Sequence, residues 1–190
     1  MTDEIVRTSE EHPVVPVKDD KEIQQALALI GDVVENSSHL KLNWLLKTGW
    51  VAVPVESGGH FQEREAEWFS IATLSLGCNE CFAIATEPLI NTPLCYMVKT
   101  SQEGFMAIDR ACAGMNYILI AKNRAFAVLL TTEDYFIVAG PSNFVVKAIG
   151  SSISTARRMF LNFSNDSLWP AYIRERLLKV AERYQSYNGR

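Results

Sequence analysis

Three short apolar runs between Tyr117 and Ala139 constrain the fold of this chain more than any other feature. The stretch reads YILIAKNRAFAVLLTTEDYFIVA, with polar breaks at residues 123–124 and 132–134. A buried helix is the rival interpretation of an apolar run. The β-branched and aromatic residues, the short runs and the short breaks favour an antiparallel meander of three strands.

Apolar side chains occupy every position of residues 117–121 and 125–130, rather than every second position. A strand with one wet face alternates, so we expect these strands at the centre of a sheet that is covered on both faces. Burial of each large apolar side chain contributes about 1.5–3 kcal/mol, and the meander should therefore dominate the core. Either helices supply both covering layers, or a second copy of the protein supplies one.

The rest of the chain predicts a mixture of helices and further strands. Strands are predicted at residues 50–55, 81–86 and 94–100, the first at a sheet edge because Pro54 cannot donate to a ladder. Residues 62–76 fit a helix or a strand, and we choose a helix because glutamates open the segment and Gly77 ends it. Other helices are predicted after a cap at Asp19 or Asp20, at residues 39–48 before Gly49, after Ser101, from Pro141 to about Asn162 through Gly150, and after Pro170.

These elements predict an α+β fold, a mostly antiparallel sheet of about six strands with helices packed on its faces. The meander that leads through a turn into a long helix resembles, in outline, small sensor and adaptor domains of the profilin-like, GAF-like or roadblock-like type. Such a resemblance would not fix the function. We expect residues 20–190 to form a single globular domain. Residues 1–19 are predicted to be a flexible acidic arm, because they have no period and Pro13 and Pro16 interrupt regular pairing.

The charge distribution excludes several classes of partner. Residues 1–20 hold six acidic and two basic residues, which accounts for the whole net charge of −4. The neutral body argues against nucleic acid as a partner. No apolar run approaches the ~18 residues that span a bilayer, and the acidic N-terminal residues do not resemble a secretory signal. We therefore expect a cytoplasmic protein that does not bind membranes and whose four cysteines are thiols.

The sharpest local motif is the CxxC pair of Cys78 and Cys81. Two thiols at this spacing can share a metal ion or form a redox disulfide. A zinc site would need two more ligands, for which Cys95, Cys112 and His60 are the candidates. The pair follows Gly77 and leads into a strand, so no helix dipole lowers the pKa of its thiols. Ordinary buried thiols are therefore the favoured interpretation, because free cysteine is among the most buried residue types.

Other candidate residues are scattered along the chain. His60, near Glu63 and Glu65, suggests acid–base chemistry, although a histidine on a surface loop is the more ordinary interpretation. The four tryptophans, Trp44, Trp50, Trp68 and Trp169, are more often core or boundary residues than ligand platforms, although Trp50 beside a glycine and Trp68 among glutamates could line a groove. The sequence contains no G-x-S-x-G, P-loop, G-x-G-x-x-G or HExxH motif.

The sequence therefore favours a non-catalytic regulatory or adaptor module that binds a protein partner or a small ligand. We expect no catalytic residues, no cofactor and no nucleic-acid partner, and we expect a homo-oligomer such as a dimer or a complex with another protein. The alternative is a thiol redox or zinc-binding protein that uses Cys78 and Cys81.

Overall fold

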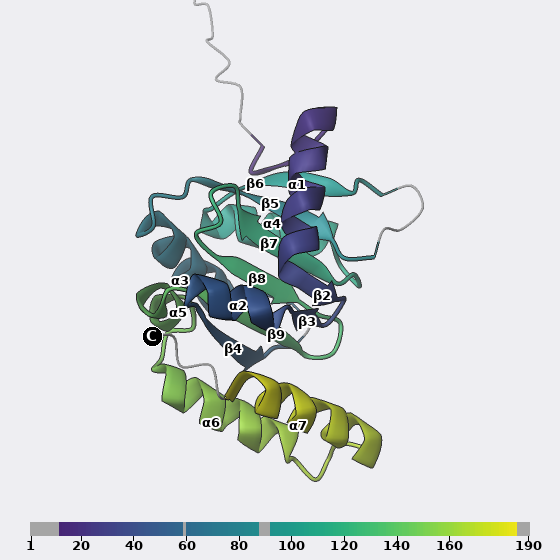
Figure 1. Cartoon of the computed structure of the whole chain (residues 1–190), viewed down its shortest axis with the longest axis vertical. Helices are drawn as coiled ribbons and strands as arrows, with labels where there is room; N and C mark the ends of the chain where they lie inside the picture. The colour runs from purple at the N-terminus through teal and green to yellow at the C-terminus, as the bar shows by residue number, and fades with distance from the viewer. Residues whose placement is uncertain (1–11, 59, 88–91, 186–190) are drawn as a thin grey trace, which may run out of the picture.

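The computed structural model describes residues 12–58, 60–87 and 92–185. In this part the chain folds around one antiparallel sheet of seven strands in the order β1-β6-β5-β7-β8-β9-β4 (Figure 1). The strands are β1 (Val14–Pro16), β4 (Val51–Glu56), β5 (Glu80–Ala85), β6 (Cys95–Lys99), β7 (Tyr117–Ala121), β8 (Ala127–Leu130) and β9 (Tyr135–Gly140). A separate two-stranded ribbon pairs β2 (Val34–Asn36) with β3 (His39–Leu40). The predicted α+β fold and the β7–β8–β9 meander are confirmed.

Seven helices of the described residues surround this sheet. They are α1 (Asp20–Val33), α2 (Leu42–Thr48), α3 (Glu63–Leu74), α4 (Gln102–Ala111), α5 (Ser142–Ala148), α6 (Ile153–Ser164) and α7 (Ala171–Gln185). Figure 1 shows α1 and α2 in front of the sheet, and α6 and α7 side by side next to β4. None of the helices in the described ranges has the length and apolar character that crossing a bilayer requires.

The central strands are buried on both faces, as their unbroken apolar runs predict. On β7, Leu119 packs into the layer formed by α3, α4 and α5, whereas Ile118 and Ile120 pack into the layer that contains α1, α2, α6 and α7. Successive side chains of a strand point to opposite faces, which is why one run of sequence feeds both layers. Helices of the same chain supply both layers, so the fold does not require a second copy to cover the sheet.

Prolines lie on both edge strands. The predicted edge position of Pro54 is confirmed, because β4 pairs only with β9 within the described sheet. At the opposite edge, β1 pairs with β6 and includes Pro16, so the expectation that residues 1–19 lack regular pairing is wrong for Val14–Pro16. The physical reason is that alternate residues of an edge strand direct their N–H groups away from the sheet, where a missing donor removes no ladder bond. Residues 1–11 of the predicted arm lie outside the described residues.

A break at Gly150 divides the predicted long helix into α5 and α6. Gly150 has φ +62, a left-handed conformation that ends α5. Ser152 then caps α6, because its Oγ accepts a hydrogen bond from the Thr155 N–H at 3.1 Å. The sequence interpretation treated this glycine as a tolerated interruption. Gly150 instead ends α5, and the turn that it forms brings α6 beside the edge strand β4.

The other helix boundaries follow local signals closely. The segment that fitted either a helix or a strand is a helix, α3, and its start carries a capping box between Gln62 and Glu65. Asp19 caps α1, and Gly49 ends α2 in the left-handed conformation. The predicted start of a helix at His39 is wrong, because His39 and Leu40 pair with β2 and α2 begins at Leu42.

Replacement of Gly150 by alanine should lower the free energy of unfolding. The left-handed conformation costs a residue with a Cβ about 1–2 kcal/mol, and that Cβ would lie 2.6 Å from carbons of the Trp68 indole. Gly31→Ala is the matched control, because Gly31 lies in α1 with open space around its Cβ position, and the change should stabilise the helix by about 0.5–1 kcal/mol. Urea unfolding of both variants measures the difference. Equal effects of the two substitutions would contradict the proposed role of Gly150.

Candidate functional site

The two cysteines of the CxxC motif occupy different environments. Cys81 lies on β5, fully buried in the layer of α3, α4 and α5, and burial raises the pKa of its thiol strongly. Cys78 follows the turn at Gly77, and its Sγ lies 3.7 Å from Asn123 Oδ1. Burial also raises the pKa of Cys78. A reactive thiol needs a lowered pKa, so both shifts have the wrong sign for nucleophilic or redox chemistry.

The other predicted metal ligands do not gather around this pair. Cys95 pairs with Ile84 of β5 and faces the layer of α1, on the opposite side of the sheet from Cys81. Burial raises the pKa of Cys95 and of Cys112 to about 12. All four cysteines are free thiols. Across the described residues, no group of three or more His, Cys, Asp or Glu side chains is arranged to hold a metal ion.

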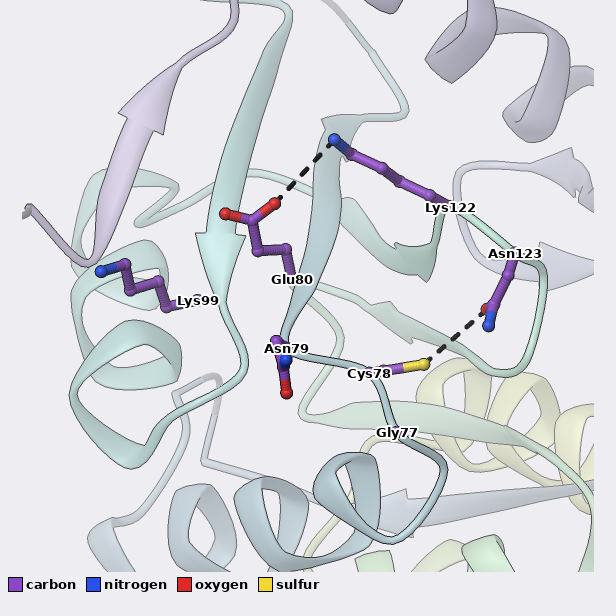
Figure 2. A pocket seen from close by; sticks show the side chains of 7 residues that line it. All are labelled: Gly77, Cys78, Asn79, Glu80, Lys99, Lys122 and Asn123. Atoms are coloured by element: carbon purple, nitrogen blue, oxygen red, sulfur yellow. Dashed lines mark hydrogen bonds and ion pairs between the residues drawn. The ribbon is translucent and has the colours of Figure 1, made fainter.

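A polar pocket surrounds Cys78 at the end of β5 (Figure 2). It has a volume of about 640 Å³ and is lined by Gly77, Cys78, Asn79, Glu80, Lys99, Lys122 and Asn123. Lys122 forms an ion pair with Glu22 at 3.2 Å and approaches Glu80 at 4.0 Å. An anionic ligand would compete with these carboxylates for the lysine. The pocket is therefore open and polar, its Lys122 is already paired with carboxylates, and the thiol that lines it, Cys78, has a raised pKa.

His60 forms a contact that the sequence did not predict. Its Nδ1 lies 3.0 Å from Oδ2 of the buried Asp109, and the Tyr117 hydroxyl donates to the other carboxylate oxygen at 3.1 Å. Burial, with Asp109 beside it, raises the pKa of Tyr117 well above its ordinary value, so the hydroxyl keeps its proton and remains a donor. The two side chains satisfy both oxygens of a carboxylate in the core and fasten the residue 60 loop to α4. No local motif signals a pair that is 49 residues apart.

An apolar groove lies where the corner between α5 and α6 meets α3 and β4. We define this α3–α6 groove by its lining residues, Val55, Glu56, Glu65, Trp68, Phe136, Ala148, Ile149, Gly150, Ser151, Ala156, Met159 and Phe160. Its volume is about 330 Å³. The groove exists because α5 ends at Gly150 and because that glycine leaves room for the Trp68 ring.

The rim of the α3–α6 groove combines apolar side chains with carboxylates. Met159 of α6 is 57% exposed although it is a large apolar residue. On α3, Ile71 and Leu74 continue from Trp68 at intervals of three residues and are also exposed, which extends the apolar surface along the helix. Glu56 and Glu65 line the groove as well, and burial raises the pKa of Glu65. The site is therefore apolar at its base and acidic on one side.

The sequence identified one of the two candidate groove tryptophans. Trp68 lines the α3–α6 groove, as its position among glutamates suggested. Trp50 does not, because it is buried against Trp44 with ring centroids 4.7 Å apart. Comparison of the chain with known protein families, with curated proteins and with solved structures found no match. The resemblance in outline to profilin-like, GAF-like or roadblock-like domains therefore stays a prediction.

Thiol labelling should distinguish Cys78 from the other cysteines. In the native protein we expect Cys78 to react first, because it lines the polar pocket, and more slowly than an unburied thiol, because its pKa is raised. Cys81, Cys95 and Cys112 should react only as the chain unfolds. Reaction with a chromogenic disulfide at constant pH, with and without urea, measures the phases, and Cys78→Ser should abolish the early one. Native labelling of Cys81 at the rate of Cys78 would support the redox alternative instead.

Loss of the Tyr117 hydroxyl should destabilise the fold measurably. A hydrogen bond to a charged group contributes about 1.5–3 kcal/mol, so Tyr117→Phe should lower the free energy of unfolding by about that amount. Tyr135→Phe is the control, since the Tyr135 hydroxyl donates to the Ser38 carbonyl at 3.3 Å, a neutral bond that contributes about 0.5–1.5 kcal/mol. Chemical denaturation of both variants tests the order. A larger loss of unfolding free energy in Tyr135→Phe than in Tyr117→Phe would contradict the strength assigned to the hydrogen bond between Tyr117 and Asp109.

Proposed function

We propose that this protein is a non-catalytic regulatory or adaptor module that binds a segment of a partner protein in the α3–α6 groove. The observation that carries the proposal is an apolar groove whose rim includes Met159, exposed to solvent and next to the half-buried Trp68. Exposed aromatic and methionine side chains are enriched where proteins bind partners. A cytoplasmic location, favoured by the four free thiols, belongs to the same proposal.

The lining of the groove indicates what kind of segment would bind. Val55, Trp68 and Met159 offer apolar contacts to large aliphatic or aromatic side chains. Glu56 and Glu65 would attract a lysine or arginine on the same segment, and a cation beside the half-buried Glu65 would offset the cost of its partial burial. The partner segment is therefore expected to be apolar with at least one basic residue.

A protein segment fits this surface better than a small molecule. The groove volume of about 330 Å³ is near the lower end of the roughly 300–1,000 Å³ that small-molecule sites occupy. Outside the groove, the exposed Ile71 and Leu74 extend the apolar surface along α3 beyond the reach of a small ligand. A longer segment could contact the groove and this stripe together.

The thiol alternative depends on the CxxC spacing alone. A redox pair would need at least one of Cys78 and Cys81 to ionise to a thiolate, yet burial raises the pKa of both. A zinc site would need two of Cys95, Cys112 and His60 to join them. Cys95 faces the other side of the sheet, and His60 is held by Asp109.

Selection of peptides from a random display library on the full chain tests the proposed function. The enriched peptides should combine large apolar residues with lysine or arginine. Met159→Glu should weaken a selected peptide at least about tenfold, equivalent to 1.4 kcal/mol, because it replaces an apolar contact on the groove rim by a charge. Glu56→Gln should weaken it less and should reduce the preference for basic residues, because Glu65 remains in the groove. Calorimetric titration with the synthetic peptide measures both effects.

Leu168→Glu is the matched control for the groove variant. Leu168 lies between α6 and α7, is 87% exposed and does not line the groove, so the substitution adds the same charge elsewhere on the surface. It should leave peptide affinity unchanged. A selected peptide that tolerates Met159→Glu, or that loses equal affinity in both variants, would show that partners do not bind in the α3–α6 groove.

A further inference from the structure

The strand β1 forms one edge of the sheet with very little chain. It spans Val14–Pro16 and pairs with β6 in antiparallel register, with Val15 opposite Met97. The Lys99 N–H donates to the Pro13 carbonyl and the Val17 N–H donates to the Cys95 carbonyl, each at 2.9 Å. Alternation along an antiparallel ladder therefore turns the backbone groups of Pro13, Val15 and Val17 towards β6, and those of Val14 and Pro16 away from it.

Few side-chain contacts hold β1 in place. Val14 packs against the layer of α3, α4 and α5, and Val17 packs against the layer of α1, but both are only partly buried. Val15 is 48% exposed. A short edge strand with so little buried apolar surface opens at a low free-energy cost compared with the central strands. Its departure would expose backbone groups along β6 that can pair with another strand.

The connection from β1 to α1 is very short. Val17 is still bonded to β6, and Asp19 already caps α1 by accepting from the Glu22 N–H at 2.9 Å. Only Lys18 lies between these two anchored residues. Short hinge connections favour exchange of the preceding element with a second copy, in which the strand continues away from its own domain.

We propose that two copies of this protein exchange β1, so that residues 13–17 of each copy pair with β6 of the other. The occupant of the β6 edge is a second copy because residues 13–17 already fit its register, bonds and side-chain contacts. Each β1–β6 pairing of the closed form is kept in the exchanged form, and only the backbone around Lys18 changes. Exchange of an identical element is a low-cost route to a dimer.

Pro16 explains why such an exchange would stop at two copies. Its nitrogen lies at a position that faces away from β6, so the outer edge of the exchanged strand lacks a donor there. The reciprocal contact is also closed by its symmetry, because each copy gives one β1 and accepts one. The inferred dimer is separate from the α3–α6 groove, and it can fail while the proposed function holds.

Disulfide trapping between two variants of the full chain, each with one cysteine added to the four buried native ones, tests the exchange. Pro16 and Tyr96 are directly opposite in the register and form a pair without mutual hydrogen bonds, where Cα atoms are closest. One copy carries Pro16→Cys and the other, with a purification tag of different mass, carries Tyr96→Cys. After mixing at high protein concentration in a thiol–disulfide buffer, only exchange of β1 brings these two cysteines together. We expect a covalent heterodimer, and tenfold dilution before oxidation should lower its ratio to monomer about tenfold.

Val15→Cys mixed with Tyr96→Cys is the matched control. Residue 15 is one position away and points to the other face of the sheet, so it should give no heterodimer above background. A second measurement uses the otherwise unchanged chain with four Gly/Ser residues inserted after Lys18, which relaxes the turn in the closed form. Native mass spectrometry should then show a dimer fraction reduced at least fivefold. The proposal would be overturned if the mixture of Pro16→Cys and Tyr96→Cys gave no heterodimer. It would also be overturned if the insertion left the dimer fraction unchanged.

Discussion

The burial of β7, β8 and β9 on both faces is the constraint on which the rest of this structure depends. Every residue of these three strands is buried, so the sheet needs an apolar layer on each side. The seven helices of the described chain meet that need, and most of their apolar stripes are used in doing so. Surface for other purposes is left mainly on the outer sides of helices and at the sheet edges. Both proposed contacts lie in such places, one at the corner of α5 and α6 and the other along β6.

Sequence reasoning predicted the elements whose signals are local. Unbroken apolar runs identified the meander, Asp19 and Ser101 identified helix starts, and Pro54 identified an edge strand. The break at Gly150 was missed because glycine in a helix costs only about 1 kcal/mol, which leaves a continuous helix credible. What decides the break is the left-handed backbone together with the closeness of Trp68, a residue 82 positions earlier in the chain. The strand β1 was missed because three residues, with Pro13 before them and Pro16 as the last of them, carry almost no pattern.

The candidate sites show the same division between local and distant information. The CxxC spacing was visible in the sequence, but the face that each thiol occupies depends on strand register. Cys81 lies opposite Val98, and Cys95 lies three positions away opposite Ile84, so an odd offset puts the two thiols on different sides of the sheet. The pairing of His60 with Asp109 depends on where α4 packs, and no residue near either one signals it. Trp68 was one of two tryptophans that could line a groove, although a core or boundary position was the more ordinary interpretation, and its packing against Gly150 decides the outcome.

The two edges of the sheet are protected by different means, and the difference determines where another strand could add. Beside β4, α6 contributes Phe160 to one layer and Ala156 to the other, and Arg157 donates to the Ala52 carbonyl at 3.4 Å. Addition of another strand beside β4 would require α6 to leave the core, and this would expose buried apolar surface on both faces of the sheet. At the other edge of the described sheet, β1 is the strand that covers β6, and its removal costs a few backbone bonds and the partial burial of Val14 and Val17. Strand addition is therefore favoured at β6. Residues 13–17 of the same chain already pair there, so any other strand must displace them.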